Sequence, residues 1–317
     1  MRILTFDELT PEMERSRGLA NIAAFGTILS RARIDTMRHM HLISDYVGVF
    51  AVERQRVLGH VFVELIPYDF PEGADIVAGI ATVGTRPDAG RSGVASALLR
   101  EAHRREHEAG RRYAALWTNR SWGAHSLYER LGYRDVYSSP WALHVPTARR
   151  PRAGAVGPAH RSDLDEIDRL HNRMAEGRWG YCRRVVGSTR AAVRHRYLDP
   201  DNDLLVTRKD GRLTGYAYLE RSSRRVICGE VVATSQKVTR QLVDGVGRVA
   251  GSLPYAFQHT LVTDNPELFG EPGYVTGPLS WYGMMALDLR REWSTPAAEA
   301  VFGTRDPRFL CLAGDRF

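Results

Sequence analysis

The sequence predicts an α/β fold in which helices cover a mixed α+β sheet, repeated in two tandem domains. Two observations support this prediction. Apolar runs of strand length alternate with amphipathic helical segments over residues 1–148, and the same alternation returns over residues 159–289. The segment between them, 149–158, is rich in Arg, Gly and Pro and is predicted to be a linker. Residues 290–317 are expected to form a C-terminal tail.

The first domain is expected to start with helices and to continue as strands that alternate with helices. "PEMERSRGLANIAAF" and "SRARIDTMRHMH" have helical spacing. Three strands are expected next, at 46–53, 57–68 and 75–85, because these segments are rich in β-branched and aromatic residues. The rest of the domain is expected to contain a helix at 92–110, a strand at 113–119, a helix at 123–132 and a strand at 133–145.

The second domain is expected to follow the same rhythm. Residues 161–176 and 187–199 have helical patterns, and residues 203–222 predict a hairpin that turns on Asp210-Gly211. The remaining predicted elements are a strand at 224–234, a helix at 235–253 and late strands at 256–263 and 280–289.

The chain is basic, but its charge does not favour nucleic-acid binding. The 317 residues carry 44 basic and 37 acidic side chains, a net charge of +7. The linker, which is the densest basic segment, contains no aromatic residue that could stack on bases, so solvated charge is the preferred interpretation. Three widely spaced cysteines predict reduced thiols and no metal knuckle. With no signal-peptide or membrane-spanning run, a cytoplasmic location without membrane contact is expected.

A turn rich in small residues, "RPDAGRSG", separates the third strand from the next helix. Gly90 and Gly93 allow the backbone to turn and to approach a ligand closely. Arg91 adds positive charge, and the N-terminus of the helix offers unpaired N–H groups. Ser92 is expected to cap this helix. These features predict an anion site suited to a pyrophosphate; an ordinary capped helix is the alternative.

Two short segments follow one another in the first domain: "GRSGVA", from Gly90 to Ala95, and "SWGAHSLYERLGY", at 121–133. Together they resemble two motifs of the GCN5-related N-acetyltransferase (GNAT) superfamily, and the resemblance covers residues 40–145. The first motif is (Q/R)-x-x-G-x-(G/A), in which Gly90 replaces the usual Gln or Arg. The second is N-x-x-A-x-x-(L/F)-Y-E-x-x-G-(F/Y), in which Ser replaces the first Asn. Its matching residues are Ser121, Ala124, Leu127, Tyr128, Glu129, Gly132 and Tyr133.

The resemblance implies acetyl-CoA as the cosubstrate and no metal. In the family, the strand before the turn separates from its neighbour, and its free backbone groups pair with the pantetheine arm. The residues that match this strand are Thr82, Val83, Gly84 and Thr85. The residues that match the pyrophosphate site are Gly90, Arg91, Ser92, Gly93, Val94, Ala95 and Ser96, and further cosubstrate contacts are expected at Ser121 and Ala124.

The resemblance also implies catalytic roles. The backbone N–H of Val83 would polarise the thioester carbonyl and stabilise its oxyanion. Tyr128 matches the tyrosine that protonates the departing thiolate; the alternative is an aromatic side chain packed beside Leu127. Glu64 lies on a strand that borders the acceptor cleft in the family and is a candidate general base; the favoured alternative is a surface charge on an edge strand. His60 is expected to be a structural polar residue.

Among the tandem-domain branches, the first domain resembles the enhanced-intracellular-survival (Eis-type) acetyltransferases. The second domain has no glycine in its equivalent junction, "EVVATSQKVTRQL", and is interpreted as a degenerate copy that walls the acceptor cleft. Mycothiol synthases use the second copy for catalysis, which argues against that branch. Eis-type proteins also have a sterol-carrier-like domain, for which the 290–317 tail is too short. Their terminal carboxylate acts as a base, so Phe317 is a further catalytic candidate; a frayed terminus is the preferred alternative.

The expected acceptor is a primary amine of a small molecule such as an antibiotic, an amino sugar or a polyamine-like compound, because two domains would enclose the cleft. Asp69, Glu72 and Asp75 could attract a cationic acceptor, although a solvated loop is the preferred interpretation. A protein-lysine acetyltransferase and a non-catalytic acyl-CoA-binding sensor or assembly protein remain as alternatives. The presence of Tyr128 favours turnover over binding alone. Assembly into a homo-oligomer stays open.

Overall fold

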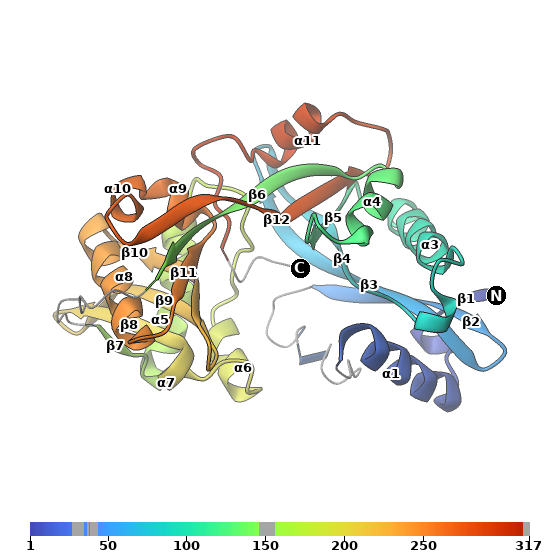
Figure 1. The fold of residues 1–317 in the computed structure, drawn as a ribbon, viewed down its shortest axis with the longest axis horizontal. Helices are drawn as coiled ribbons and strands as arrows, with labels where there is room; N and C mark the ends of the chain where they lie inside the picture. Colours follow the sequence, from blue (N-terminus) through green and yellow to red (C-terminus); the bar gives the residue numbers. More distant parts are fainter. Residues whose placement is uncertain (27–34, 37, 39–43, 146–155, 313–317) are drawn as a thin grey trace.

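A computed structural model describes residues 1–26, 35, 36, 38, 44–145 and 156–312, with the backbone alone at 278–281 (Figure 1). Within these residues the strands form one twelve-stranded mixed sheet, in the order β1-β2-β3-β4-β5-β12-β6-β11-β10-β9-β8-β7. This mixed sheet with flanking helices confirms the predicted fold class. The three cysteines are not bonded to one another. No helix in the described part of the chain is long and apolar enough to cross a membrane.

The N-terminal half packs helices on both faces of its strands. Its strands are β1 (Arg2–Thr5), β2 (Asp45–Glu53), β3 (Arg56–Phe70), β4 (Gly73–Thr85), β5 (Tyr113–Thr118) and β6 (Arg134–His144). Its helices are α1 (Pro11–Phe25), α3 (Val94–Glu108) and α4 (Gly123–Arg130), with short 3-10 turns at η1 (Phe6–Glu8) and η2 (Pro87–Ala89). Leu98 of α3 packs with Val61 and Val63 of β3. Met13 of α1 packs with Phe62 on the opposite face, and Figure 1 shows α1 and α3 on opposite sides of these strands.

The C-terminal half begins at the end of the predicted linker. Its strands are β7 (Val156–Pro158), β8 (Leu204–Lys209), β9 (Arg212–Arg221), β10 (Val226–Ala233), β11 (Tyr255–Gln258) and β12 (Tyr274–Asp288). Its helices are η3 (Arg161–Asp163), α5 (Leu164–Ala175), α6 (Ser188–Arg194), α7 (Pro200–Asp203), α8 (Gln236–Ala250), α9 (Thr260–Asp264), α10 (Pro266–Phe269) and α11 (Thr295–Phe302). The hairpin turn is confirmed, because Asp210 and Gly211 both have the positive φ that a two-residue turn requires.

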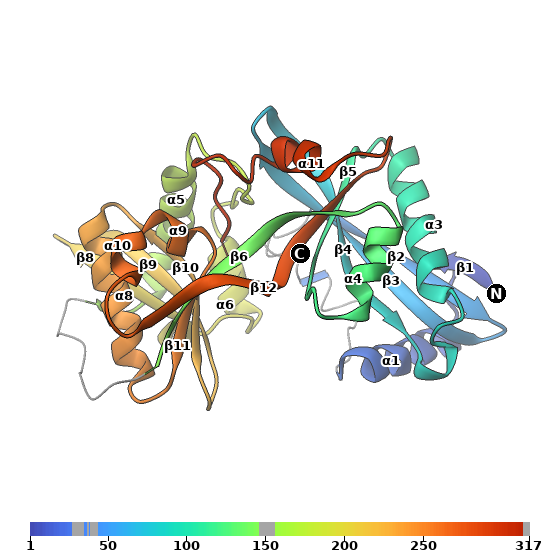
Figure 2. The ribbon, with the colours of Figure 1, turned by 45° about the horizontal axis from the view of Figure 1, so that its top comes forward.

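Two long strands tie the halves together. Gly283 to Asp288 of β12 pairs with β5 on one side, and the same stretch pairs with β6 on the other. The far end of β6, from Trp141 to His144, pairs in turn with β11. Figures 1 and 2 show β6 and β12 running through the middle of the molecule from one half to the other. The sheet is therefore continuous across the predicted domain boundary, and the tandem arrangement itself stays a prediction.

Two expectations about the elements need revision, and a third is mostly untested. The end of the linker is a strand, because Val156 packs on α8 at Gly245, where an added Cβ would lie 2.8 Å from Val156 Cγ1. The strand expected at 256–263 ends at Gln258, since His259 has a φ of 64° and starts α9. The helix expected at 30–41 lies mostly outside the described residues.

Candidate functional site

The junction between β4 and α3 has an open helix N-terminus. After η2 the chain turns through Arg91, with a φ of 60°, and Gly93, with a φ of 82°. Gly93 is the N-cap residue, and α3 has no side-chain cap hydrogen bond among the described residues. That first turn also contains no acidic residue. The N–H groups and the partial positive charge of the helix are thus available to an anion, and a side chain at position 93 would strain the turn.

The predicted cap at Ser92 is wrong. Its Oγ donates to the carbonyl of Ala89 at 2.6 Å and closes the turn instead of capping the helix. The nearest acidic side chain on this turn, Asp88, is held by the guanidinium groups of Arg56 and Arg86. Arg91 is exposed at the junction. The charge balance of the turn therefore favours a negatively charged ligand.

β4 separates from β5 just where it approaches this junction. The two parallel strands pair at Ala78 with Ala114 and at Gly79 with Ala115, and within the described residues their register extends no further. On its other side β4 carries a bulge, because one residue of β3, Val61, opposes two residues of β4, Thr82 and Val83, between the pairs Phe62–Ala81 and His60–Gly84. Among the described residues, the backbone from 82 to 85 is thus not paired with β5.

The β5–α4 loop contains a residue that sequence reasoning missed. Asn119 Oδ1 accepts hydrogen bonds from the backbone N of Ser121 at 2.9 Å and from its Oγ at 2.7 Å. The Ser121 hydroxyl and the Asn119 side-chain amide therefore hold the loop together. Asn119 lies two residues before the first position of the motif. Ala124 packs in the same cluster as α3. Both helices thus pack into one cluster and begin at the carboxyl ends of β4 and β5.

Tyr128, on α4, is buried in the core of the N-terminal half. Its ring makes an edge contact with Tyr133 at 5.8 Å, and it belongs to the cluster that contains Val94 and Leu98. Burial raises the pKa of Tyr128 to about 12, so the phenol stays protonated at neutral pH. The packing role and a proton-donating role are both compatible with this position.

Glu64 is not on an edge strand, because β3 lies between β2 and β4. It sits opposite Tyr46 on β2 and Gly79 on β4. It is half-buried, and burial raises the pKa of its carboxyl group to about 7. Tyr46 donates its hydroxyl to Asp35 at 3.3 Å. A carboxylate poised near neutral pH is a chemically suitable general base.

The acidic residues at the β3–β4 hairpin do not form a common site. Asp69 pairs with Arg183 at 3.4 Å, and its carbonyl accepts from Gly180 N at 2.7 Å, so it ties the hairpin to the C-terminal half. Asp75 accepts from the backbone N of Ile76, and Glu72 is exposed. Their main role in this structure is local, as the solvated-loop interpretation held for Glu72 and Asp75.

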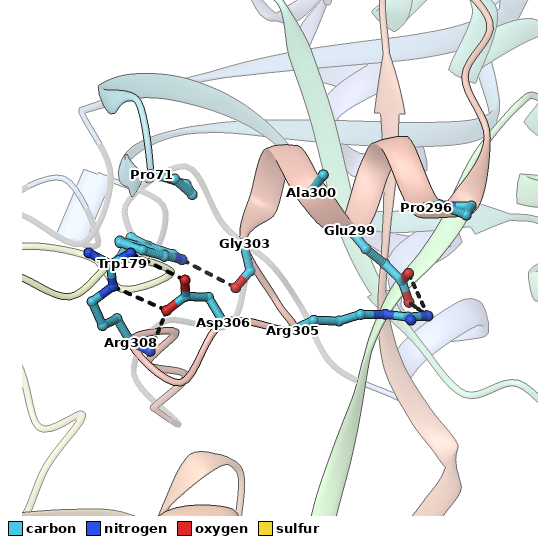
Figure 3. Close-up of a pocket in the computed structure, with 9 residues that line it drawn as sticks. All are labelled: Pro71, Trp179, Pro296, Glu299, Ala300, Gly303, Arg305, Asp306 and Arg308. Atoms are coloured by element: carbon cyan, nitrogen blue, oxygen red, sulfur yellow. Dashed lines mark hydrogen bonds and ion pairs between the residues drawn. The ribbon is translucent and has the colours of Figure 1, made fainter.

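A cavity of about 400 Å³ lies elsewhere, between the hairpin and the C-terminal tail (Figure 3). Its lining residues are Pro71, Trp179, Pro296, Glu299, Ala300, Gly303, Arg305, Asp306 and Arg308. None of them is a predicted site residue. Glu299 pairs with Arg305, Asp306 pairs with Arg308, and Trp179 donates to the carbonyl of Gly303, as the dashed lines show. These groups bind one another and anchor the tail.

The tail continues into the middle of the molecule. Phe309 to Leu312 are buried, and Thr260 Oγ1 donates to the carbonyl of Cys311 at 3.1 Å. Phe317, the candidate terminal carboxylate, lies outside the described residues. No cluster of three His, Cys, Asp or Glu side chains suited to a metal occurs in the described part of the chain.

The comparison with family models matches this region. The model described as "Acetyltransferase (GNAT) domain" matches residues 45–135, which span β2 to the start of β6. Residues 45–135 are a GNAT acetyltransferase domain. This domain contains the open N-terminus of α3, the part of β4 that is not paired with β5, Glu64 and Tyr128. The match supports the interpretation of the protein as an N-acetyltransferase. No curated protein matches the chain.

Solved structures share the fold well beyond the GNAT domain. A probable N-acyltransferase of Enterococcus faecalis is 15% identical with a TM-score of 0.66, and 91% of this chain covers 72% of that one. A GCN5-related N-acetyltransferase of Kribbella flavida is 19% identical with a TM-score of 0.64, and the match covers 90% of this chain and 70% of that one. Eis1 of Mycobacterium abscessus is 17% identical with a TM-score of 0.59, covering 92% and 74%. The fold is thus consistent with the Eis-type resemblance of the sequence.

Proposed function

We propose that this protein transfers the acetyl group of acetyl-CoA to a primary amine of a small molecule. The observation that carries the proposal is that two features adjoin in the chain. The end of β4 is not paired with β5, and it leads into the uncapped N-terminus of α3. In this proposal the backbone of Thr82, Val83, Gly84 and Thr85 pairs with the pantetheine arm. The N–H groups from Gly90 to Ser96 hold the pyrophosphate.

The GNAT domain would supply three groups to the transfer. The amine nitrogen forms a bond to the thioester carbonyl carbon, and the C–S bond breaks. The N–H of Val83 stabilises the negative charge on the carbonyl oxygen. The proton lost by the amine goes to the carboxylate of Glu64, directly or through water, and the departing thiolate takes the proton of the Tyr128 hydroxyl.

Crowding at the end of β5 supports a small acceptor over a protein tail. Tyr282 of β12 stacks on Trp117 with a ring separation of 5.4 Å. Phe309 of the tail lies 5.1 Å from Tyr137 of β6, and Trp117 packs with this same tail cluster. The C-terminal half and the tail thus pack against the end of β5, the strand beside the unpaired part of β4.

The test is a thiol-release assay with acetyl-CoA and a panel of antibiotics, amino sugars, polyamines and lysine peptides. Turnover with a small amine, reduced by about 100-fold or more in Tyr128→Phe, is expected if the phenol is the acid. Tyr255→Phe, which removes a phenol from the C-terminal half, is the matched control and should keep wild-type rates. Acetyl-CoA binding without any thiol release would favour the sensor, and release with peptides alone would favour a protein-lysine acetyltransferase.

A further inference from the structure

The bulge in β4 concentrates features that do not help the fold. Thr82 has a φ of 44°, in the left-handed region that a β-branched residue avoids. Its Oγ1 is buried and has no hydrogen-bond partner among the described residues. Both features cost stability, and strained residues and unsatisfied polar groups of this kind gather at functional sites.

His60, on the neighbouring strand, shows a related anomaly. The side chain is 0% exposed, and neither ring nitrogen has a hydrogen-bond partner in the described part of the chain. Its ring lies 5.6 Å from Phe62 and 6.2 Å from Phe25. Burial, with a smaller contribution from Arg17, lowers the pKa of His60 to about 4. The imidazole is therefore neutral and offers one lone pair and one N–H.

Strand register places these two residues beside the segment proposed to hold the thioester. His60 pairs with Gly84, and the bulge of Thr82 and Val83 lies between this pair and Phe62–Ala81. An added Cβ on Gly84 would lie 2.8 Å from Cε1 of His60, so the ring packs directly on that backbone. Glu64, by contrast, pairs with Gly79, further along the strand. Among the ionisable side chains of β3, His60 is thus nearest in register to Val83.

We infer that the side chains of His60 and Thr82 accept the N–H groups of the acceptor amine at the bulge. The inference rests on the proposed function. A free primary amine has two N–H groups and one lone pair. If the imidazole nitrogen and the Thr82 oxygen each accept one N–H, the lone pair points at the carbonyl carbon. Once the N–C bond has formed, one of these two protons passes through water to the carboxylate of Glu64 as the C–S bond breaks. A neutral imidazole also avoids repelling a cationic acceptor.

This arrangement selects a primary amine over its N-methylated analogue. A secondary amine has a single N–H, so one of the two buried acceptors would stay unpaired, and sites of this kind reject such analogues strongly. We expect wild-type kcat/KM for a primary amine to exceed that for its N-methyl analogue by at least about tenfold.

The decisive variant is Thr82→Val, which removes the hydroxyl and keeps the shape and the branched Cβ. We expect kcat/KM for the primary amine to fall about 10- to 100-fold, while the Kd for acetyl-CoA stays within about twofold and Tm is unchanged or higher. The preference for the primary amine should shrink. His60→Leu should behave in the same way, and His60→Gln, which keeps a hydrogen-bond acceptor, should recover part of the activity.

The matched control is Thr207→Val in the C-terminal half, where the hydroxyl bonds Thr214 at 3.0 Å. That variant should lose Tm and keep activity, the reverse of Thr82→Val. Wild-type kcat/KM and selectivity in Thr82→Val would overturn the inference, as would a parallel loss of acetyl-CoA affinity. If the wild-type protein binds acetyl-CoA but acetylates no amine, the proposed function fails first and the inference falls with it.

Discussion

The β4–α3 and β10–α8 junctions have the same topology and satisfy their polar groups in opposite ways. In each, a strand pairs in parallel with the first residues of the strand that follows the helix, carries a bulge, and leads into that helix. At α3 the N-cap is Gly93, with no side-chain acceptor. At α8 the N-cap is Ser235, whose side chain accepts from the N of Val238. The second junction is completed by its own chain, whereas the first leaves donors for a ligand.

The carboxylates on or beside the strands of the two junctions differ in the same way. Glu230 of β10 accepts from Arg184 at 2.8 Å and from the hydroxyl of Tyr216, and His171 lies 3.5 Å away. Burial alone would raise its pKa, but Arg184 and these neighbours lower the pKa of Glu230 to about 2. Glu64 has a pKa raised to about 7 by burial. A paired carboxylate stabilises the fold, and one poised near neutral pH is suited to proton transfer.

The largest expected effect of this contrast is on stability. Glu230→Ala leaves the guanidinium of Arg184 half-buried without its partner and should lower the free energy of unfolding by about 3–5 kcal/mol. Urea denaturation measures this change. The Kd for acetyl-CoA of the folded variant should match the wild type. A loss below about 1 kcal/mol would show that the network does not stabilise the C-terminal half.

A second prediction concerns the pH dependence that Glu64 imposes. Its carboxylate form is needed to accept a proton, so kcat/KM should rise with pH and reach half of its plateau near pH 7. Glu64→Gln should lower the plateau by about 100-fold and remove this limb, leaving only the titration of the amine itself. An unchanged pH profile in the variant would exclude Glu64 as the base.

The raised pKa of Glu64 also makes the stability of the folded protein depend on pH. Burial disfavours the carboxylate, so its ionisation costs the folded state stability as the pH rises from about 4.5 to about 7. Glu64→Gln should therefore raise Tm relative to the wild type at pH 8 and leave it unchanged at pH 4. Thermal unfolding at the two pH values checks this prediction independently of activity.

A further prediction concerns a glutamate introduced into the first turn of each of the two helices. Ser96→Glu in α3 adds an acid where the helix dipole favours it, so stability should hold, but the Kd for acetyl-CoA should rise at least about tenfold through repulsion of the pyrophosphate. Lys237→Glu in α8 also places a glutamate in the first turn of a helix, and it should leave this Kd unaltered. Equal effects of the two variants, measured by calorimetry, would remove the distinction between the junctions.

Local sequence signals predicted much of this molecule. Hydrophobic periodicity placed most helices and strands, Asp210-Gly211 marked its hairpin, and Gly93 marked the turn into α3. These signals work because each depends on a few neighbouring residues. The Ser92 cap failed because a serine hydroxyl can also bond back to a preceding carbonyl, here that of Ala89.

Features that depend on distant parts of the chain had no such signal. The insertion of β12 between β5 and β6 joins residues far apart in the sequence, and no local pattern encodes that pairing. Glu64 looked like an edge-strand charge because its neighbours on both sides were unknown. The burial of His60 and the positive φ of Thr82 depend on the register of β3 and β4, which the alternation of residues does not fix.

Amide hydrogen exchange with and without acetyl-CoA tests the central contrast most directly. The account predicts slower exchange on ligand addition at residues 82–85 and 91–97, around β4 and the start of α3, and no change at residues 235–241 in α8. Protection of the α8 N-terminus, or of both helix N-termini equally, would contradict the claim that the first junction alone is built to hold the cosubstrate.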